Sequence, residues 1–598
     1  MKPVDAQLLP SLDRRDFLVC GGLAVVAGCA GPAVRSQSPE DAEMASIEKQ
    51  VRLVESVAGP FGMHFVKAES TALVVGLADT GSDPPPSPQR AELMADMQAR
   101  GVINPNSVLA SPSTALVVVG TFLPPAAQRG DTLDLEVIVP PHNDTTSIAG
   151  GWLMETRLKE KALLGGQIHD GHVLAIGEGP LLVDPPGPND KTSQLRGRVL
   201  GGGKVLHNRS LGLMINSDDK SVFLSKQIGD ALNRRFHSYA HGVQQGVATP
   251  KTDQYIELLL HPRYKYNMPR YMRVVRSIAI HESPQEQAGR LRLLEKQLLD
   301  PVTSSTAALR LEAVGKDGIP VLRTGLKMSD PEVRFYSAEA LAYLDDTSSA
   351  KVLGETARNQ AAFRAHALTA MSALNDVESA DELRALLDVP SAETRYGAFR
   401  ALWAMNPHDP GIQGDDCNGR FFYHALHTGG PPMVHVTRSF RAEVVTFGPD
   451  QLLQLPLSVD AGKSIVVNGT NGAEGAADGA HITVSRFEVG KPDQKRVVST
   501  RLDDVIRAIV ELEGNYPDVV QFLQQAKACG ALTCRFEVDA LPNPSRLYDR
   551  TKTDGPAAGG DGYQVATPLP NLFAPPGQAS HIPDVGSDPD TKSSAAAK

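Results

Sequence analysis

The chain has 598 residues, long enough for roughly three to five domains, because single hydrophobic cores rarely grow beyond about 250 to 300 residues. Its composition, 41% hydrophobic and 21% charged, is typical of globular protein. The formal net charge of -10 gives no electrostatic reason to expect nucleic-acid binding, so this class of function is set aside.

The N-terminus is typical of an export signal. Arg14 and Arg15 precede a short apolar stretch, residues 17–27, which is too short to span a bilayer comfortably as a mature helix. The run RRDFL resembles a twin-arginine motif, and VAGC resembles a lipoprotein cleavage box in which Cys29 is the acylated residue. The alternative for Cys29 is an ordinary thiol within a cleaved signal peptide. We expect residues 1–29 to be the signal and the small, polar residues 30–45 to be a tether.

Residues 46–290 alternate short β-branched runs with turn residues, which indicates an α+β region dominated by strands. Apolar residues at helical spacing predict two helices within it, over residues 88–100 and 222–236. The predicted strands are residues 72–77, 115–122, 132–140, 172–183 and 211–216.

Residues 291–412 have a different pattern, of Ala-rich amphipathic helices. The segments VRFYSAEAL, FRAHALTAM and TRYGAFRAL share the order Arg-x-x-(small)-x-x-Ala-(Leu or Met), and their arginines are Arg334, Arg364 and Arg395. This spacing of 30 and then 31 positions is typical of stacked helix pairs. The sequence therefore predicts a HEAT-like array of about three to four units. The alternative is one helical bundle that repeats a common Ala-Leu pattern. We expect the three arginines to bind carboxylates or helix ends of the neighbouring unit.

Strand-like segments return in residues 413–542, and this region ends in a helix pair and a last strand. The predicted strands are residues 440–447, 452–459, 464–470 and 481–489. The two helices carry apolar stripes, and Gly530 ends the second of them. Residues 543–598 are rich in Pro, Gly, Ser, Ala and Asp, which predicts a disordered tail. The fold class is therefore α+β, with strand-rich regions on both sides of a helical solenoid.

Three cysteines remain once a signal peptide is removed: Cys417, Cys529 and Cys534. In an oxidising periplasm, Cys529 and Cys534 are placed for a local disulfide across the turn between them, with Cys417 left free. The sequence does not fix this pairing.

Two short motifs resemble phosphate loops but lack the required first glycine. They are GGGK at residues 201–204 and AGKS at residues 461–464, and we expect both to be turns. The chain has no Gly-x-Ser-x-Gly nucleophile elbow, and its acidic residues show no spacing that singles out an acid/base pair. The sequence therefore predicts no catalytic residues and no cofactor.

Two groups of residues are candidates for a metal site. His237 and His241 are four residues apart, but the general-base Glu of a His-Glu-x-x-His site is absent. A second group is close in sequence but is interrupted by aromatic residues that indicate ordinary packing; it comprises Cys417, His424, His427 and His435. We expect no metal at either place.

Residues 46–260 resemble the N-terminal region of the flagellar basal-body P-ring protein family. The stretch TALVVGLADTGSDPP follows the family pattern of a strand, Gly-Leu and Thr-Gly-Asp, with one inserted residue. The matching residues there are Leu73, Val74, Val75, Gly76, Leu77, Thr80, Gly81, Ser82 and Asp83. Further matches are Leu123, Pro124, Pro125, Ala127, Gly130, Thr146, Ser147, Ile148, Gly150, Gly151, Leu153, Ala175, Gly179, Pro180, Leu181 and Val183.

The closing helix pair resembles the end of the same family. The matching residues are Leu502, Asp504, Val505, Ala508, Leu512, Pro517, Asp518, Leu523, Gln524, Lys527, Gly530, Ala531 and Leu532. By this resemblance, residues 46–290 and 413–542 are P-ring-like, and the array at 291–412 is an insertion. The family is ordinarily a soluble periplasmic protein exported by the general route, so the signal type, the array and the tail are additions.

The resemblance implies a structural subunit, not an enzyme. In this family, many copies form a periplasmic ring around the flagellar rod, near peptidoglycan, and work with the outer-membrane L ring as a bushing. An acylated Cys29 would add an anchor, and the residue after it favours the outer membrane. The alternative is an envelope lipoprotein adaptor, outside the flagellum, whose array binds an unknown protein. A third alternative, an envelope hydrolase, has little support in the sequence.

Overall fold

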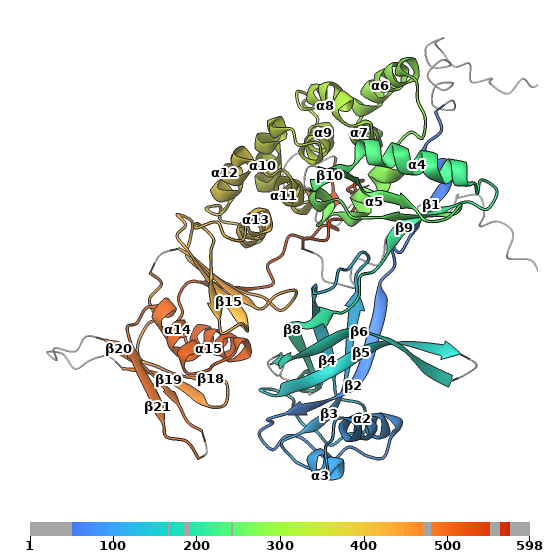
Figure 1. Cartoon of the computed structure of the whole chain (residues 1–598). Coiled ribbons are helices and arrows are strands. Elements are labelled where there is room, and N and C mark those ends of the chain that lie inside the picture. The colour runs from blue at the N-terminus through green and yellow to red at the C-terminus, as the bar shows by residue number, and fades with distance from the viewer. Residues whose placement is uncertain are drawn as a thin grey trace, which may run out of the picture. The chain divides into compact units, whose positions relative to one another are not determined.

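The computed structural model describes residues 51–164, 167–184, 192–240, 243–448, 450–470, 480–488, 490–550 and 563–573 (Figure 1). The described helices and strands all belong to one compact unit within residues 52–598. The fold of that unit is α+β, and strand-rich regions stand before and after a helical region in the chain, as the sequence predicts.

The first strand-rich region is an antiparallel sheet that closes on itself. Its strand order is β4-β3-β2-β5-β6-β8-β7, and β4 also pairs with β8. Alternate side chains of these strands point inward and form a core of their own, which includes Ala72, Val117, Leu135 and Val199. The strands are β2 (Val66–Val75), β3 (Ala115–Leu123), β4 (Thr132–Ile138), β5 (Trp152–Leu164), β6 (Gln167–Pro180), β7 (Leu182–Val183) and β8 (Arg196–Val205).

The turn after β2 explains the glycines of the TALVVGLADTGSDPP stretch. The amide of Gly81 donates to the carbonyl of Pro112 at 2.8 Å. A Cβ on Gly81 would lie 2.0 Å from the carbonyl oxygen of Thr114, so only glycine fits this close approach. The stretch is thus a strand followed by a turn that packs against the loop before β3. The predicted helix at 88–100 follows it as α2 (Pro88–Ala99), and α3 (Pro105–Leu109) comes next.

A second sheet has the order β1-β9-β13-β12, with all neighbours antiparallel. The predicted helix at 222–236 is α4, which buries Leu224, Ile228 and Leu232, spaced four residues apart on one face. The strands and helix are β1 (Ala58–Phe61), β9 (Leu211–Ile215), α4 (Val222–Arg235), β12 (Ala248–Pro250) and β13 (Tyr255–Leu258). A hairpin of β10 (His237–Ala240) and β11 (Val243–Gly246) follows α4.

The helical region begins before residue 291, because α5 lies before this position and α6 starts before it. Asp330, Asp376 and Ser391 accept hydrogen bonds from the first turns of α9, α12 and α13, which fixes where these helices start. The helices are α5 (Met268–Arg276), α6 (Pro284–Leu298), α7 (Ser304–Val314), α8 (Ile319–Gly325), α9 (Pro331–Tyr343), α10 (Ala350–Asn359), α11 (Arg364–Ala373), α12 (Val377–Leu386) and α13 (Ala392–Met405). Short 3-10 turns connect some of them: Lys316–Gly318 and Thr347–Ser349.

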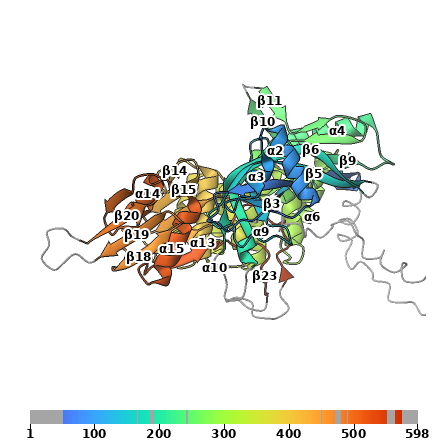
Figure 2. The same cartoon turned by 90° about the horizontal axis from the view of Figure 1, so that it is seen from below.

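The C-terminal region contains two further sheets, of order β14-β15-β17-β16-β22 and β18-β19-β20-β21. The two predicted helices, α14 and α15, bury their apolar stripes in the core of this region beside β18 to β20 (Figure 2). The elements are β14 (Asp415–Cys417), β15 (Phe421–Leu426), β16 (Met433–Val436), β17 (Glu443–Phe447), β18 (Leu457–Ala461), β19 (Ile465–Thr470), β20 (His481–Arg486), β21 (Gln494–Val498), α14 (Leu502–Glu511), α15 (Tyr516–Ala528) and β22 (Arg535–Val538).

Part of the predicted tail is folded. Within residues 543–598, the structure describes residues 543–550 and 563–573, which include the paired strands β23 (Leu547–Tyr548) and β24 (Tyr563–Gln564). Val565, Leu572 and Phe573 are buried in the same core as the array helices. These described residues are therefore folded, contrary to the prediction, because a few apolar side chains in this Pro-rich segment pack on the array.

Candidate interaction sites of the helical array

The two motifs that resemble phosphate loops form part of a strand and a turn between strands. Residues 201–204 lie within β8, so the expected turn there is wrong: the glycines belong to a strand of the closed sheet. A Cβ on Gly203 would lie 2.8 Å from a methyl of Leu135, which explains the absence of a side chain. Residues 462–464 form the predicted turn, between β18 and β19.

The histidines considered as metal ligands lie on separate strands, or just after one, where the structure describes them. His237 begins β10, so it is on a strand and not on a helix, and His241 lies outside the described residues. No group of three or more potential ligands is brought together within the part of the chain that the structure describes. His424 and His435 are on β15 and β16, which β17 separates, while His427 is exposed after β15.

The buried members of that group have structural roles. His435 stacks on Tyr396 with ring centroids 3.6 Å apart, and its Nε2 accepts from the amide of Ala540 at 3.0 Å. Burial lowers the pKa of His435 to about 3, so the ring is neutral. Burial also raises the pKa of the Cys417 thiol to about 11, which keeps it protonated and unreactive.

The remaining predicted residues are placed as follows. Arg14, Arg15 and Cys29 lie outside the described residues. Cys529 and Cys534 carry free thiols in the structure: Cys529 is exposed just after α15, and the Cys534 sulfur contacts the side chain of Gln451 at 3.0 Å. Their pairing in an oxidising compartment stays a prediction.

The repeated arginines bind neighbouring helix ends and carboxylates, as expected. Arg364 donates through Nε to the carbonyl of Ala357, in the last turn of α10, at 2.9 Å. Arg395 makes the equivalent bond to the carbonyl of Leu387, which follows α12, at 2.8 Å. Arg334 pairs with Glu355 of α10 at 3.2 Å. In each repeat, an arginine near the start of one helix therefore binds a backbone carbonyl or a carboxylate of the helix before or after it.

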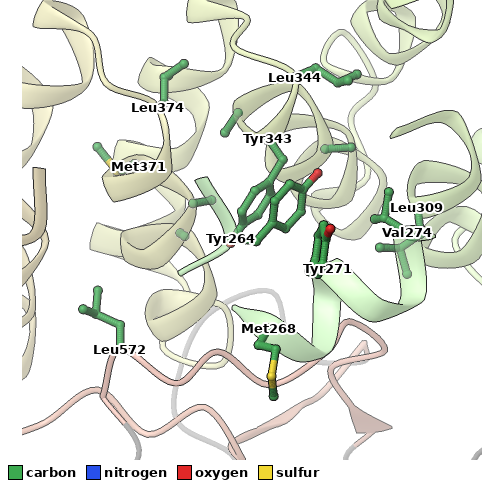
Figure 3. Close-up of a cluster of buried hydrophobic side chains, with 14 of the residues drawn as sticks. Tyr264, Met268, Tyr271, Val274, Leu309, Tyr343, Leu344, Met371, Leu374 and Leu572 are labelled. Atoms are coloured by element: carbon green, nitrogen blue, oxygen red, sulfur yellow. The ribbon is translucent and has the colours of Figure 1, made fainter. Parts of the chain in front are cut away.

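A buried ion network joins the array to the sheet region that precedes it. Arg270 of α5 donates to Glu312 of α7 at 2.6 Å and forms an ion pair with Glu339 of α9 at 2.6 Å. The three side chains are at most 1% exposed. Tyr264 donates to the other oxygen of Glu312 at 2.6 Å. The aromatic rings around this network come from different elements, and Tyr343 stacks on Tyr264 (Figure 3).

The network has two carboxylates for one guanidinium. Burial raises the pKa of both Glu312 and Glu339, and the charge of Arg270 opposes that shift. Removal of the guanidinium would leave two buried acids without a cation, a costly arrangement. The network therefore fixes α5, α7 and α9 in one arrangement.

A second buried network joins the last array helix to the C-terminal sheet. Tyr396 of α13 donates to Glu443 of β17 at 2.5 Å, and Glu443 has no exposed surface. Arg400 and Arg441 lie 3.5 and 3.4 Å from the same carboxylate. The array is thus held by buried charges at both of its ends.

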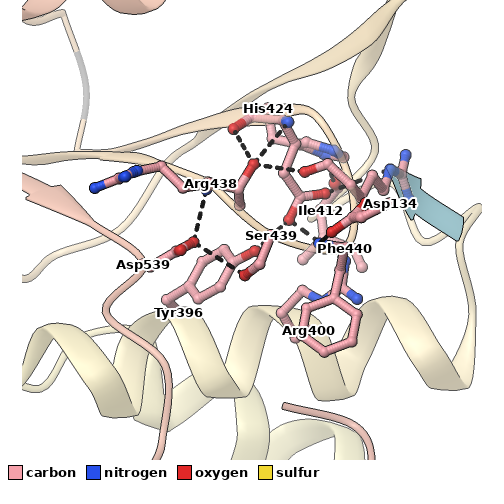
Figure 4. A network of polar contacts seen from close by, with 12 residues as sticks. Asp134, Tyr396, Arg400, Ile412, His424, Arg438, Ser439, Phe440 and Asp539 are labelled. Carbon is pink, nitrogen blue, oxygen red and sulfur yellow. Dashed lines mark hydrogen bonds and ion pairs between the residues drawn. The ribbon is translucent and has the colours of Figure 1, made fainter. Parts of the chain in front are cut away.

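A third polar contact links the closed sheet to the C-terminal region. Asp134 of β4 accepts from the amides of Gly201, at 2.8 Å, and Phe440, at 2.5 Å (Figure 4). Burial raises the pKa of Asp134 to about 6, and nearby Asp539 adds to the effect. Asp539 itself accepts from the amide of Arg438 at 2.7 Å.

Sequence reasoning did not single out Arg270, Glu312 or Glu339. The signal available was weak: each lies in a helical run rich in apolar residues or Ala, but other charged residues, such as Arg273 and Arg310, lie in the same runs. A charge at such a position has a partner when it is buried, but the sequence does not name the partner. These contacts hold the fold together, and none of them places reactive groups around an open cavity.

Comparison with known proteins identifies two parts of the chain. Residues 70–289 match the family model described as flagellar P-ring protein. The resemblance to that family is confirmed. Residues 319–403 match the model described as HEAT repeats, so the helical array predicted from the repeated arginines is confirmed as well.

Three curated relatives carry the name flagellar P-ring protein: those of Escherichia fergusonii, Shigella dysenteriae serotype 1 and Escherichia coli O139:H28. Each is 24% identical over 344 residues, which cover 53% of this chain and 89% of the relative. This similarity extends beyond residues 70–289, and the P-ring-like sequence accounts for about half of the chain. Among the described residues, no helix has the length and apolar character needed to cross a membrane.

Proposed function

We propose that the chain is a structural subunit of the periplasmic P ring of the bacterial flagellar basal body. The observation that carries the proposal is the alignment with curated P-ring proteins over 89% of their length. Copies of the chain assemble by heterologous contacts into a closed ring around the rod, close to peptidoglycan. Together with the L ring of the outer membrane, the ring acts as a bushing for rotation and supports motility. It has no catalytic role and needs no cofactor.

Export and anchoring complete the proposal. The signal that contains Arg14 and Arg15 directs the chain to the periplasm, and acylation of Cys29 holds it at the outer membrane. One acylated residue anchors a protein only modestly, but a ring of many copies multiplies the anchoring. In a Cys29→Ser variant we expect the protein to leave the membrane fraction for the soluble periplasmic fraction. A variant that stays in the membrane fraction would contradict the lipid anchor.

The test of the main proposal is imaging of basal bodies from the native cell, in which the chain carries a tag after Lys598. We expect negative-stain images to show gold-labelled antibody on a ring around the rod. Unlabelled basal bodies, in cells where the tagged protein is present elsewhere in the envelope, would contradict the proposal.

The second candidate is an envelope adaptor that works outside the flagellum and binds another protein through its array. The match of residues 319–403 to HEAT repeats favours it, because such arrays are common protein-binding surfaces. Labelled protein away from basal bodies, together with a purified protein that stays monomeric, would favour the adaptor over the ring subunit.

A further inference from the structure

The C-terminal segment, which we define as residues 541–550 and 563–573, crosses one face of the helical array. Its first half contacts α13, α11 and α9, and its second half contacts α9 and α5. It forms no helix, and its only strands are the two short ones that pair its halves. An extended segment that crosses one face of several helices of a repeat array has the geometry of a bound peptide.

The helices present side chains at helical spacing to this segment. On α9 these are Glu332, Tyr336 and Glu339, which share one face because they are four and three residues apart. Glu332 pairs with Arg550, the Tyr336 hydroxyl accepts from the amide of Ala566 at 3.1 Å, and Glu339 accepts from the Thr567 hydroxyl at 2.9 Å. One stripe of α9 is thus filled by both halves of the segment.

The other two helices continue the same face. Glu393 of α13 accepts from Arg546 at 2.5 Å, and the ring of Phe363, just before α11, packs on Tyr548 with centroids 4.7 Å apart. A Cβ on Gly397 of α13 would lie 2.6 Å from the ring of Pro542, so a glycine makes room for the segment. The face therefore offers carboxylates at two places, with aromatic and small residues between them.

The two halves of the segment are held differently. The side chains of Arg546 and Arg550 are 35% and 36% exposed, so water and salt partly screen their ion pairs, although the Glu332 side chain is only 7% exposed. Thr567, by contrast, is buried, and it accepts from Arg270 at 2.9 Å while it donates to Glu339. Leu572 belongs to the same buried hydrophobic core as Tyr264 and Tyr343 (Figure 3). The first half is therefore the one that a competing segment can replace more easily.

We propose that the face formed by α9, α11 and α13 is a peptide-binding surface, and that its resident ligand is the chain's own C-terminal segment. The chemistry it selects is an extended peptide with two arginines four residues apart, followed by a hydroxyl side chain and bulky apolar residues. Another protein reaches this face only when a segment of that kind displaces the resident one. This inference does not depend on the ring proposal, since it concerns only the array and the segment.

The test uses a chain that ends at Pro542 and a fluorescent synthetic peptide of residues 543–573. Fluorescence anisotropy should show saturable binding to the shortened chain and at least tenfold weaker binding to the full chain, whose face is occupied. A peptide with Arg546→Ala, Arg550→Ala and Thr567→Val should bind the shortened chain at least tenfold more weakly. Equal binding to both chains would overturn the proposal, and so would no binding to a shortened chain of unchanged helical circular dichroism.

A second measurement covers the case in which the shortened chain does not fold. Hydrogen exchange of the full chain should show slow exchange at the amides of Ala566 and Asn571, which donate to Tyr336 and to the carbonyl of Tyr266. Glu332→Gln with Glu393→Gln should speed exchange in residues 543–550 at least tenfold. The control Glu511→Gln changes an exposed ion pair elsewhere and should leave this exchange unchanged. Exchange at the rate of an unstructured peptide in the unmodified chain would overturn the proposal.

Light scattering distinguishes a second copy as the source of the segment. The full and shortened chains should have the same number of copies per particle under the same conditions. A full chain that loses a dimeric state when residues 543–598 are removed would show that the segment binds a neighbouring copy, and would overturn its assignment as a ligand in cis.

Discussion

The closed sheet and the helical array differ in how they are connected to the rest of the protein. The closed sheet surrounds a core of its own, formed by its own strands. The array helices share one core with the sheet before them, the sheet after them and the C-terminal segment. The array is therefore an insertion in the sequence but not a separable domain, because apolar burial and buried charges bind it to its neighbours.

The closed sheet contacts the C-terminal region through Asp134 and through the buried Leu182 of β7, and also through exposed polar groups. Arg438 pairs with Asp184, and both side chains are more than a third exposed. Lys463 donates to the carbonyl of Gly76 from an exposed position. Exposed polar contacts of this kind contribute about 0 to 1 kcal/mol each, whereas breaking a buried ion pair costs about 3 to 5 kcal/mol. Four substitutions test this difference, from the largest expected effect to the smallest.

Arg270→Met should cause the largest loss of stability. Methionine keeps an unbranched apolar side chain but removes the guanidinium that pairs with buried Glu312 and Glu339, so we expect the free energy of unfolding to fall by about 3 to 5 kcal/mol. Urea unfolding followed by circular dichroism at 222 nm, where the array helices dominate the signal, measures this loss. The control Arg496→Met breaks an exposed pair with Glu511 and should cost less than about 1 kcal/mol. Similar losses in both variants would contradict the distinction.

Tyr396→Phe should have the next largest effect, since it removes the hydrogen bond to buried Glu443. A donor to a charged acceptor contributes more than a donor to a neutral one, so we expect a loss of about 1.5 to 3 kcal/mol. The control is Tyr271→Phe, which removes a 2.9 Å bond to the neutral carbonyl of Leu259 and should cost about 0.5 to 1.5 kcal/mol. Urea unfolding of both variants gives the comparison, and a larger loss in the control would contradict the role of Glu443.

The contact at Asp134 should depend on pH. Its folded-state pKa, about 6, lies above the ordinary value of 3.8, so its contribution is fully present below pH 3.8 and is lost as pH rises through 6. We expect the difference in unfolding free energy between the wild type and Asp134→Asn to be about 1 kcal/mol more favourable to the wild type at pH 5 than at pH 7. Arg198 and Asp539 face this carboxyl, with opposite effects on its pKa. A difference that does not change with pH would refute the shift.

Arg438→Ala should have the smallest effect. It removes the exposed pair with Asp184, so we expect a loss below about 1 kcal/mol that disappears in 1 M salt. Urea unfolding at low and high salt measures it. A loss as large as that of Arg270→Met would show that the closed sheet is bound as tightly as the array, and would remove the contrast between the two regions.

Much of the fold followed from local patterns. Periodicity and turn residues predict the strands β2, β3, β4 and β9 and the helices α2 and α4. The array followed from the spacing of Arg334, Arg364 and Arg395. The turn predicted for the glycines at 201–204 is wrong. Side chains of neighbouring residues in the closed sheet leave no room for a Cβ at Gly203, and the sequence alone does not show this packing.

The sequence by itself determined the order of the regions, the repeat and the resemblance to the P-ring family. Each depends on residues close together in the chain, where spacing reports geometry. Only the tertiary structure decided that Arg270, Glu312, Glu339 and Thr567 meet, since as many as 297 positions separate the residues that bond there. It also decided that part of the Pro-rich C-terminus is folded. Composition predicts whether a segment can fold alone, not whether the rest of the chain provides a surface for it.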